Sequence, residues 1–428
     1  MNIEETIRLE RFIQLKREIR GSNKHLIVGI DIAKDKHHAF MGTATGMSLV
    51  SKLIFDNTIS GFEKLLTKTK KISEKHNLTK IVFGVEPTGN YHKPLGFHLI
   101  RCNFDVVLVS GVAVKRNREL LNGRWDKNDT KCAANVADLI SQGKCLYYES
   151  PSTGIMDLRE LLSLRKRLKK DEHSLKMRVR NGLITKYFPE LDPFFKNTEK
   201  TVLAIVSCCL DTNQIISMEL HDFIRLVTST RPSLSQRKKL ETIYDLAIYS
   251  IGCPMGESAK YEAQLLISKL KKVREEINEL EGVVESLCKN YPQYDSLLSI
   301  PGFGPYISST VLARIGNPFR FNNRSEVIRL SGYDLEASRS GKSSRSAVPV
   351  ISKKGNSTLR YALYQAALIA SARNGHVKKY FEKLLEGRER EQGIKTKMRT
   401  KLAAKMLVIA WTLMKTGELF DPAYLILE

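Results

Sequence analysis

Near the start of the chain stands the run LIVGIDI, residues 26–32, in which an apolar, β-branched stretch ends at Asp31. A second run of the same kind, IVFGVE, covers residues 81–86 and ends at Glu86. Short runs of this composition are typical of strands buried in a sheet. In α/β sheets, functional groups gather at the carboxyl ends of the strands. The two runs therefore predict a sheet that presents two carboxylates at one edge.

The segments around these runs predict a mixed α/β domain over residues 1–150. Residues 38–43 and 49–55 are short β-rich runs that follow residues 26–32 closely, which predicts an antiparallel meander. Apolar residues at helical spacing predict helices further along, and one more strand is expected, so that the order is βββαβαβα. The predicted helices cover residues 61–76, 91–102 and 129–142, and the further strand covers residues 105–109.

The remainder of the chain is predicted to be mostly helical. We assign residues 151–295 to a long helical linker, which opens with a basic helix over residues 155–187 that ends before Pro189. Residues 258–290 have an apolar stripe with spacings of three and four, as in a coiled coil. The same stripe also fits a helix that packs inside its own chain. Residues 296–428 form a third, mostly α-helical unit that ends in a basic tail.

The charge of the chain points to a polyanionic partner. Its 69 Lys and Arg outnumber 46 Asp and Glu, which gives a net charge of +23 and excludes an acidic solvating protein. Nucleic acid is the favoured partner, ahead of an anionic membrane. The charged first residues predict no secretory signal, and no apolar run of about 18 residues predicts a membrane-spanning helix. Seven cysteines without a CxxC pair favour a reduced, cytoplasmic protein without a structural zinc site.

The acids at the strand ends suggest a divalent cation. Two carboxylates held close together repel each other unless a cation lies between them. Mg²⁺ prefers oxygen ligands and keeps part of its shell for water and substrate phosphates, so a basic protein with such a pair is suited to metal-assisted phosphodiester chemistry. A third acid is expected from a helix packed on the sheet, and Asp129 begins one. Each acid taken alone could instead end a turn or cap a helix.

Two segments of the C-terminal unit resemble phosphate-binding structures. Residues 301–304 read PGFG before an apolar helix, a helix-hairpin-helix-like pattern that is also compatible with a simple turn. Residues 338–345 read SRSGKSSR, and residues 351–356 read ISKKGN. A loop of hydroxyls, bases and glycine suits phosphate binding, and a serine among cations can attack phosphorus. Composition alone favours a solvated, flexible loop over a phosphate site.

Taken in order, these motifs resemble those of the IS110/IS1111-type insertion-sequence transposases. The resemblance extends from residue 26 to about residue 375 and rests on several short segments rather than on one long match. Its segments are VGIDIAK at 28–34, EPTGNY at 86–91, KND at 127–129, ADL at 137–139, PGFGP at 301–305, LSGY at 330–333, SGK at 340–342, ISKKGN at 351–356 and LR at 359–360.

The resemblance implies an RNase H-like, RuvC-type N-terminal domain with a DEDD set of acids and a C-terminal transposase domain with a nucleophilic serine. Asp31, Glu86 and Asp129 match the first three acids, which would bind Mg²⁺. Ser340 matches the serine, with Ser338 as the alternative.

The fourth acid of this family pattern is replaced by Cys132. A thiol is a poor ligand for Mg²⁺. Asp126 lies three residues before Asp129, so on a continuous helix it would share a face with Asp129 and could substitute. Asp138 is a weaker candidate. Three acids could also suffice, or this copy could have decayed.

The family further implies that Ser340 attacks a DNA phosphodiester and forms a phosphoserine link. It implies a dimer or tetramer that acts on double-stranded DNA, at the element ends and the target, with a guide RNA from the element. Action would be in the prokaryotic cytoplasm, at the nucleoid, and backbone contacts are expected from the basic helix at residues 155–187 and the tail at 386–405. Two alternatives stay open: a Mg²⁺-dependent endonuclease like a Holliday-junction resolvase, and a decayed nucleic-acid-binding copy.

Overall fold

The chain divides into two compact units, Met1–Ser152 and Thr153–Glu428, and each is described by itself. A computed structural model gives the structure of residues 3–122, 129–195, 199–228, 230–336 and 350–426.

The first unit is built on a six-stranded mixed sheet with the strand order β3-β2-β1-β4-β5-β6. The first three strands pair antiparallel, as the predicted meander requires, while β1, β4 and β5 run parallel and β6 returns antiparallel to β5. The mixed α/β character predicted for this part of the chain is thus confirmed. The strands are β1 (His25–Asp31), β2 (Lys36–Thr43), β3 (Ser48–Asp56), β4 (Lys80–Val85), β5 (Asp105–Leu108) and β6 (Leu146–Tyr147).

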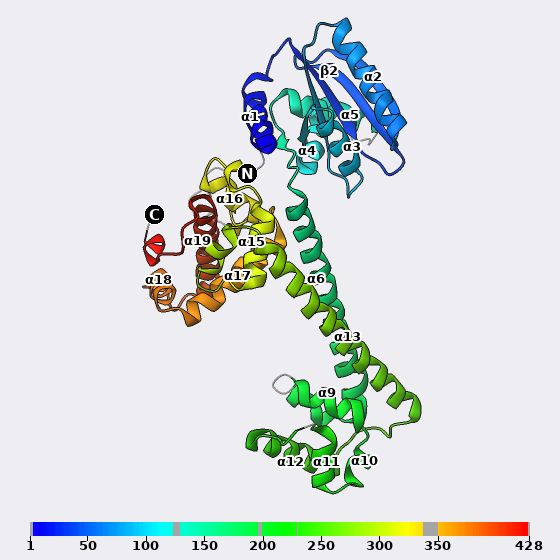
Figure 1. The fold of residues 1–428 in the computed structure, drawn as a ribbon, viewed down its shortest axis with the longest axis vertical. Helices are drawn as coiled ribbons and strands as arrows, with labels where there is room; N and C mark the ends of the chain where they lie inside the picture. The colour runs from blue at the N-terminus through cyan, green and yellow to red at the C-terminus, as the bar shows by residue number, and fades with distance from the viewer. Residues whose placement is uncertain (1–2, 123–128, 196–198, 229, 337–349, 427–428) are drawn as a thin grey trace. The chain divides into compact units, whose positions relative to one another are not determined.

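In the described part of this unit, five helices cover the two faces of the sheet (Figure 1). Alternate residues of β1 enter different cores, because successive side chains of a strand point to opposite faces. Leu26, Val28 and Ile30 pack with α2 and α3, whereas Ile27 packs with α1, α4 and α5. The helices are α1 (Ile3–Glu18), α2 (Ile59–Lys75), α3 (His92–Arg101), α4 (Gly111–Asn122) and α5 (Asp129–Ser141). The residues of α1 and α4 were not predicted to form an element.

Two paired glycines let α5 lie directly on the sheet. Gly29 of β1 and Gly84 of β4 are register partners. A Cβ at Gly29 would lie 2.2 Å from the carbonyl oxygen of Ala133, and a Cβ at Gly84 would lie 2.0 Å from Cδ1 of Ile140. A side chain at Gly29 would push the helix backbone away, whereas one at Gly84 would displace the end of the Ile140 side chain. The two glycines therefore permit the close packing of α5 on the sheet.

The second unit contains a pair of long helices that run side by side, α6 (Thr153–Arg178) and α13 (Glu257–Cys288) (Figure 1). The predicted apolar stripe of α13 is present, and its partner is α6 of the same chain. Ion pairs tie the two helices together: Arg165 to Glu281 at 2.5 Å and Arg274 to Glu172 at 2.9 Å. The apolar stripe of α13 therefore packs against another helix of the same chain.

A separate hydrophobic cluster surrounds each end of this helix pair. One cluster combines the first half of α13, from Ala259 to Leu270, with the short helices that follow α6. They are η1 (Val179–Ile184, a π-helical turn), α7 (Thr185–Tyr187), η2 (Pro189–Leu191), α8 (Asp192–Phe195), α9 (Glu199–Cys208), α10 (Thr212–Ile216), α11 (Leu220–Val227) and α12 (Leu234–Ile248). The helical run predicted over residues 155–187 thus changes to π-helix after Arg178, and Phe188 leaves the helical region before Pro189 as expected.

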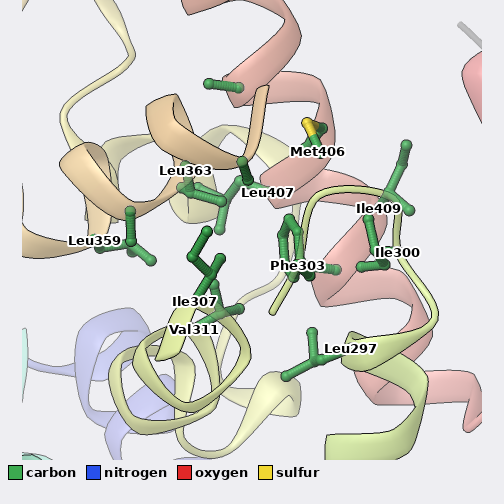
Figure 2. Packing of buried hydrophobic residues seen from close by; sticks show 14 of the residues in the cluster. Leu297, Ile300, Phe303, Ile307, Val311, Leu359, Leu363, Met406, Leu407 and Ile409 are labelled. Carbon is green, nitrogen blue, oxygen red and sulfur yellow. The ribbon is translucent and has the colours of Figure 1, made fainter. Parts of the chain in front are cut away.

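The other cluster combines the opposite ends of α6 and α13 with the C-terminal helices. Figure 2 shows Phe303 and Ile307 among side chains of the C-terminal helices, including Leu363 and Leu407. These elements are α14 (Gln293–Leu298), α15 (Pro305–Ile315), η3 (Pro318–Arg320), α16 (Arg324–Ser331), α17 (Ser357–Arg373), α18 (Gly375–Leu385), α19 (Ile394–Thr416) and η5 (Pro422–Leu425), with the short hairpin β7 (Leu335–Glu336) and β8 (Val350–Ile351).

Among the described residues, no helix is both long enough and apolar enough to cross a membrane.

Candidate active site

Asp31 and Glu86 lie side by side at the carboxyl edge of the sheet. Strands β1 and β4 are parallel neighbours in which Ile30 pairs with Val85, so the next residue of each chain segment is an acid. Parallel neighbours are about 4.8 Å apart. Both acids are half-buried. The structure therefore places the two acids at the ends of neighbouring strands, at the edge that the strand patterns predicted.

Both acids belong to the face that α5 covers. Asp31 stands two residues after Gly29 and Glu86 two residues after Gly84, and alternate residues of a strand share a face. A Cβ at Gly111 would lie 2.8 Å from Oε1 of Glu86, so this carboxylate lies against the first residue of α4. The positive end of the α4 dipole favours a negative charge there. This contact was not predicted, and its signal in the sequence is a glycine shortly after a predicted strand.

The start of α5 lies toward the same edge. At its other end, Arg20 Nε donates to the carbonyl of Gln142 (2.9 Å), just before the chain enters β1. The 13 residues of α5 span about 20 Å, close to the length of β1. Residue 129 therefore begins α5 near the end of β1 that carries Asp31. The side chain of Asp129 is not among those described, and Asp126 lies outside the described residues.

Cys132 and Asp138 occupy different faces of α5. Cys132 is three residues after position 129 and only 1% exposed, within the stripe that packs on the sheet. Asp138 is nine residues after position 129. On a helix this spacing places the two residues on opposite faces and about 13 Å apart along the helix axis. Its carboxylate accepts hydrogen bonds from Asn117 Nδ2 of α4 (2.6 Å) and from Gln142 Nε2 (2.8 Å). The structure therefore gives Asp138 a role in joining α4 to α5.

Among the residues whose side chains are described, no group of three His, Cys, Asp or Glu is placed to hold a metal ion. That set excludes Asp126 and Asp129, the two further acids of the predicted site. The described donors, Asp31 and Glu86, are both carboxylates, which are the ligands that Mg²⁺ prefers. Their side-by-side placement fits a shared cation.

The motifs of the C-terminal unit interlock through two glycines. A Cβ at Gly355 would lie 2.2 Å from the backbone nitrogen of Gly332, so the two backbones touch. Arg360 Nη1 donates to the carbonyl of Ser331 (2.8 Å), and the Tyr333 hydroxyl donates to the carbonyl of Arg360 (2.7 Å). The LSGY, ISKKGN and LR segments thus form one small packed structure.

The small packed structure formed by these segments lies next to a hairpin, and the segment that contains the candidate serines connects the two strands of this hairpin. Strands β7 and β8 pair Leu335 with Ile351, and residues 337–349 connect them. Ser340 and Ser338 belong to that connection and lie outside the described residues. Beside it, Lys353 is exposed and has a φ of 56°, a left-handed conformation that is uncommon for a non-glycine residue.

The PGFG segment joins α14 to α15, and its first glycine has a packing role. Gly302 has a φ of +83°, and a Cβ there would lie 2.5 Å from the carbonyl oxygen of Ala366 in α17. Gly304, the N-cap residue of α15, has open space around its Cβ position. Close packing against α17 therefore explains why residue 302 is a glycine. Of the two glycines, Gly304 is the one that leaves room for a nucleic-acid backbone to approach.

Part of the predicted basic face of α6 makes contacts inside the protein. Arg159 Nε donates to the carbonyl of Ala313 (2.7 Å). Arg165 pairs with Glu281 and lies 3.9 Å from the ring centroid of Tyr306. The exposed cations of α6 are Lys166, Arg167, Lys169, Lys170 and Arg178, of which Lys169 pairs with Glu172.

Two transposase family models match separate parts of the chain. Residues 28–189 match a transposase family of the DEDD, IS110 type, and residues 294–382 match the transposase family IS116/IS110/IS902. The chain is 21% identical over 406 residues to the uncharacterized 43.6 kDa protein of insertion element IS110 from Streptomyces coelicolor, covering 92% of this chain and 95% of that protein. It is 22% identical over 301 residues, 68% of this chain and 71% of the other, to a mini-circle protein of the same organism whose name proposes it as the transposase for IS117.

The mixed sheet with carboxylates at its edge and the two matched segments define a DNA transposase with an RNase H-like α/β region. The chain belongs to the IS110-type transposases.

Proposed function

We propose that this transposase cuts and rejoins DNA through a phosphoserine intermediate, with Asp31, Glu86 and Asp129 forming the acidic site and Ser340 acting as the nucleophile. The observation that supports the acidic site most strongly is the register of β1 and β4, in which Asp31 and Glu86 directly follow the paired residues Ile30 and Val85. Like charges at that spacing call for a cation.

The residues of this edge fit Mg²⁺, because the donors are carboxylates and Gly111 leaves the space that the Glu86 side chain occupies. Bound there, Mg²⁺ would supply positive charge beside a DNA phosphate. Asp31 and Glu86 would hold it, with Asp129 from α5. The Ser340 oxygen would form a bond to phosphorus as the 3′ or 5′ oxygen of the broken strand leaves, so that the phosphoester energy is kept for rejoining.

The charge of the chain supports nucleic acids as its partners. The net charge of +23 and the exposed cations of α6 suit contacts to nucleic-acid backbones. Guidance by an RNA of the element, and assembly as a dimer or tetramer, follow from the family resemblance alone.

A trapping assay tests the nucleophile. The full-length protein is incubated with element-end DNA, RNA from the element flanks and Mg²⁺, and the products are separated under denaturing conditions. We expect a covalent protein–DNA band that Ser340→Ala abolishes and Ser338→Ala retains. The reverse pattern would move the nucleophile to Ser338.

The main alternative is a metal-dependent endonuclease in which the acids activate water. Cleaved ends without a covalent band, which survive Ser340→Ala but not Asp31→Ala, would establish that alternative. A decayed copy would give no product in the wild type, and Cys132→Asp would then restore cleavage by supplying the fourth carboxylate.

A further inference from the structure

Two consecutive histidines of β2 point to opposite faces of the sheet. His37 is 0% exposed, and its ring lies 5.2 Å from that of Phe55 and 6.4 Å from that of Phe62, in the core beneath α2. Its Nδ1 accepts a hydrogen bond from the Ala33 N–H (3.3 Å). Because successive side chains of a strand alternate, the next residue, His38, belongs to the face that α5 covers.

The strand register sets His38 directly opposite Asp31. Strands β1 and β2 are antiparallel, and Asp31 is the Cα partner of His38. Directly opposite residues of antiparallel strands share a face and have Cβ atoms about 4.5–5.5 Å apart. The neighbouring pairs agree with this placement, since Ile30 and its partner Ala39 both lie in the core of the other face.

Three adjacent strands therefore present His38, Asp31 and Glu86 in one row at the edge of the sheet. His38 is half-buried, at the end of the row away from Glu86. Mg²⁺ selects oxygen rather than imidazole nitrogen, so a histidine at this place is better suited to contact a ligand than to be one. Groups that hydrogen-bond to metal ligands orient them, and their loss costs metal affinity.

We propose that His38 is a positioning residue for the acidic site, whose imidazole N–H donates to one carboxylate oxygen of Asp31 and directs the other toward Glu86. The inference rests on the proposed metal-binding role of Asp31. It adds a fourth residue to the edge, contributed by β2, which none of the family motifs contains. Orientation by a neighbour on an adjacent strand is rigid, because both residues are held by the same ladder of backbone hydrogen bonds.

Magnesium affinity, measured by isothermal titration calorimetry on the full-length protein without DNA, tests this role. We expect His38→Ala to bind Mg²⁺ about 10–100-fold more weakly than wild type. His38→Asn and His38→Gln keep an N–H donor at the positions of Nδ1 and Nε2, and at least one of them should recover most of the affinity. His76→Ala, an exposed histidine after α2, is the matched control and should leave the affinity unchanged.

Asp31→Ala separates failure of this inference from failure of the proposed function. If Asp31→Ala loses Mg²⁺ binding while His38→Ala keeps it, the positioning role of His38 is overturned and the acidic site stands. If Asp31→Ala binds Mg²⁺ like the wild type, both are overturned. Equal losses in the Ala, Asn and Gln variants, accompanied by a lower melting temperature without Mg²⁺, would make His38 a structural residue only.

Discussion

Adding one methyl group to each of the paired glycines beneath α5 should have unequal effects. At Gly29 the new Cβ would lie 2.2 Å from a backbone oxygen of α5, against 3.4 Å for ordinary contact, so the helix must retreat by roughly 1.2 Å. At Gly84 it meets the flexible end of Ile140, which can rotate away. Overpacking costs about 1–3 kcal/mol. We expect about 3 kcal/mol for Gly29→Ala and about 1 kcal/mol for Gly84→Ala.

Hydrogen exchange read by mass spectrometry measures the effect within the first unit, which matters because a chain of two units need not unfold in one step. We expect Gly29→Ala to accelerate exchange in β1 and α5 far more than Gly84→Ala does, and to reduce DNA cleavage. Gly282→Ala in α13, where a Cβ meets nothing, is the control and should stabilise its helix by about 1 kcal/mol. A Gly84→Ala variant as damaged as Gly29→Ala would refute the argument from backbone contact.

Three further changes test other parts of the structure. Asn117→Ala removes the donor that joins α4 to Asp138, and should destabilise these helices by about 2 kcal/mol, seen as faster exchange in both. Burial lowers the pKa of His37, so the folded state favours the neutral ring; stability should be constant above about pH 7 and fall as the pH drops below about 6.5, and denaturation of His37→Phe across pH 8–5 should show a smaller fall. Gly302→Ala should cost about 3 kcal/mol in thermal unfolding of the second unit, since it combines a left-handed φ with a 2.5 Å contact, whereas Gly304→Ala should cost less than 1 kcal/mol; equal costs would contradict this reading.

Local patterns were sufficient to predict most elements of the first unit. The runs ending at Asp31 and Glu86 became neighbouring strands, and the helix beginning at Asp129 was located correctly. Helix α4 was missed because GVAVKRNRELLN is more polar on average than the helices that were predicted in this unit, and it packs against α5. The two-residue strand β6 has no periodicity of its own.

The prediction that the basic face of α6 contacts nucleic acid was incomplete for a different reason. Charge in the sequence does not reveal whether a side chain meets solvent or another element. Arg159 and Arg165 read as part of a nucleic-acid-binding face, yet they bind a carbonyl and a carboxylate of neighbouring helices. The contacts join residues more than a hundred positions apart, which no local pattern encodes.

By itself, the sequence determined most element types of the first unit, the excess of positive charge and the family to which the chain belongs. These depend on residue order and on the period of apolar side chains, which are local properties. Only the tertiary structure decided that α13 pairs with α6, that Asp138 joins two helices, and that His38 stands beside Asp31. These contacts depend on which faces of the helices and strands are buried against each other. The free energy of that burial comes from contacts between segments that are distant in the sequence, so the arrangement is determined only when the whole unit packs.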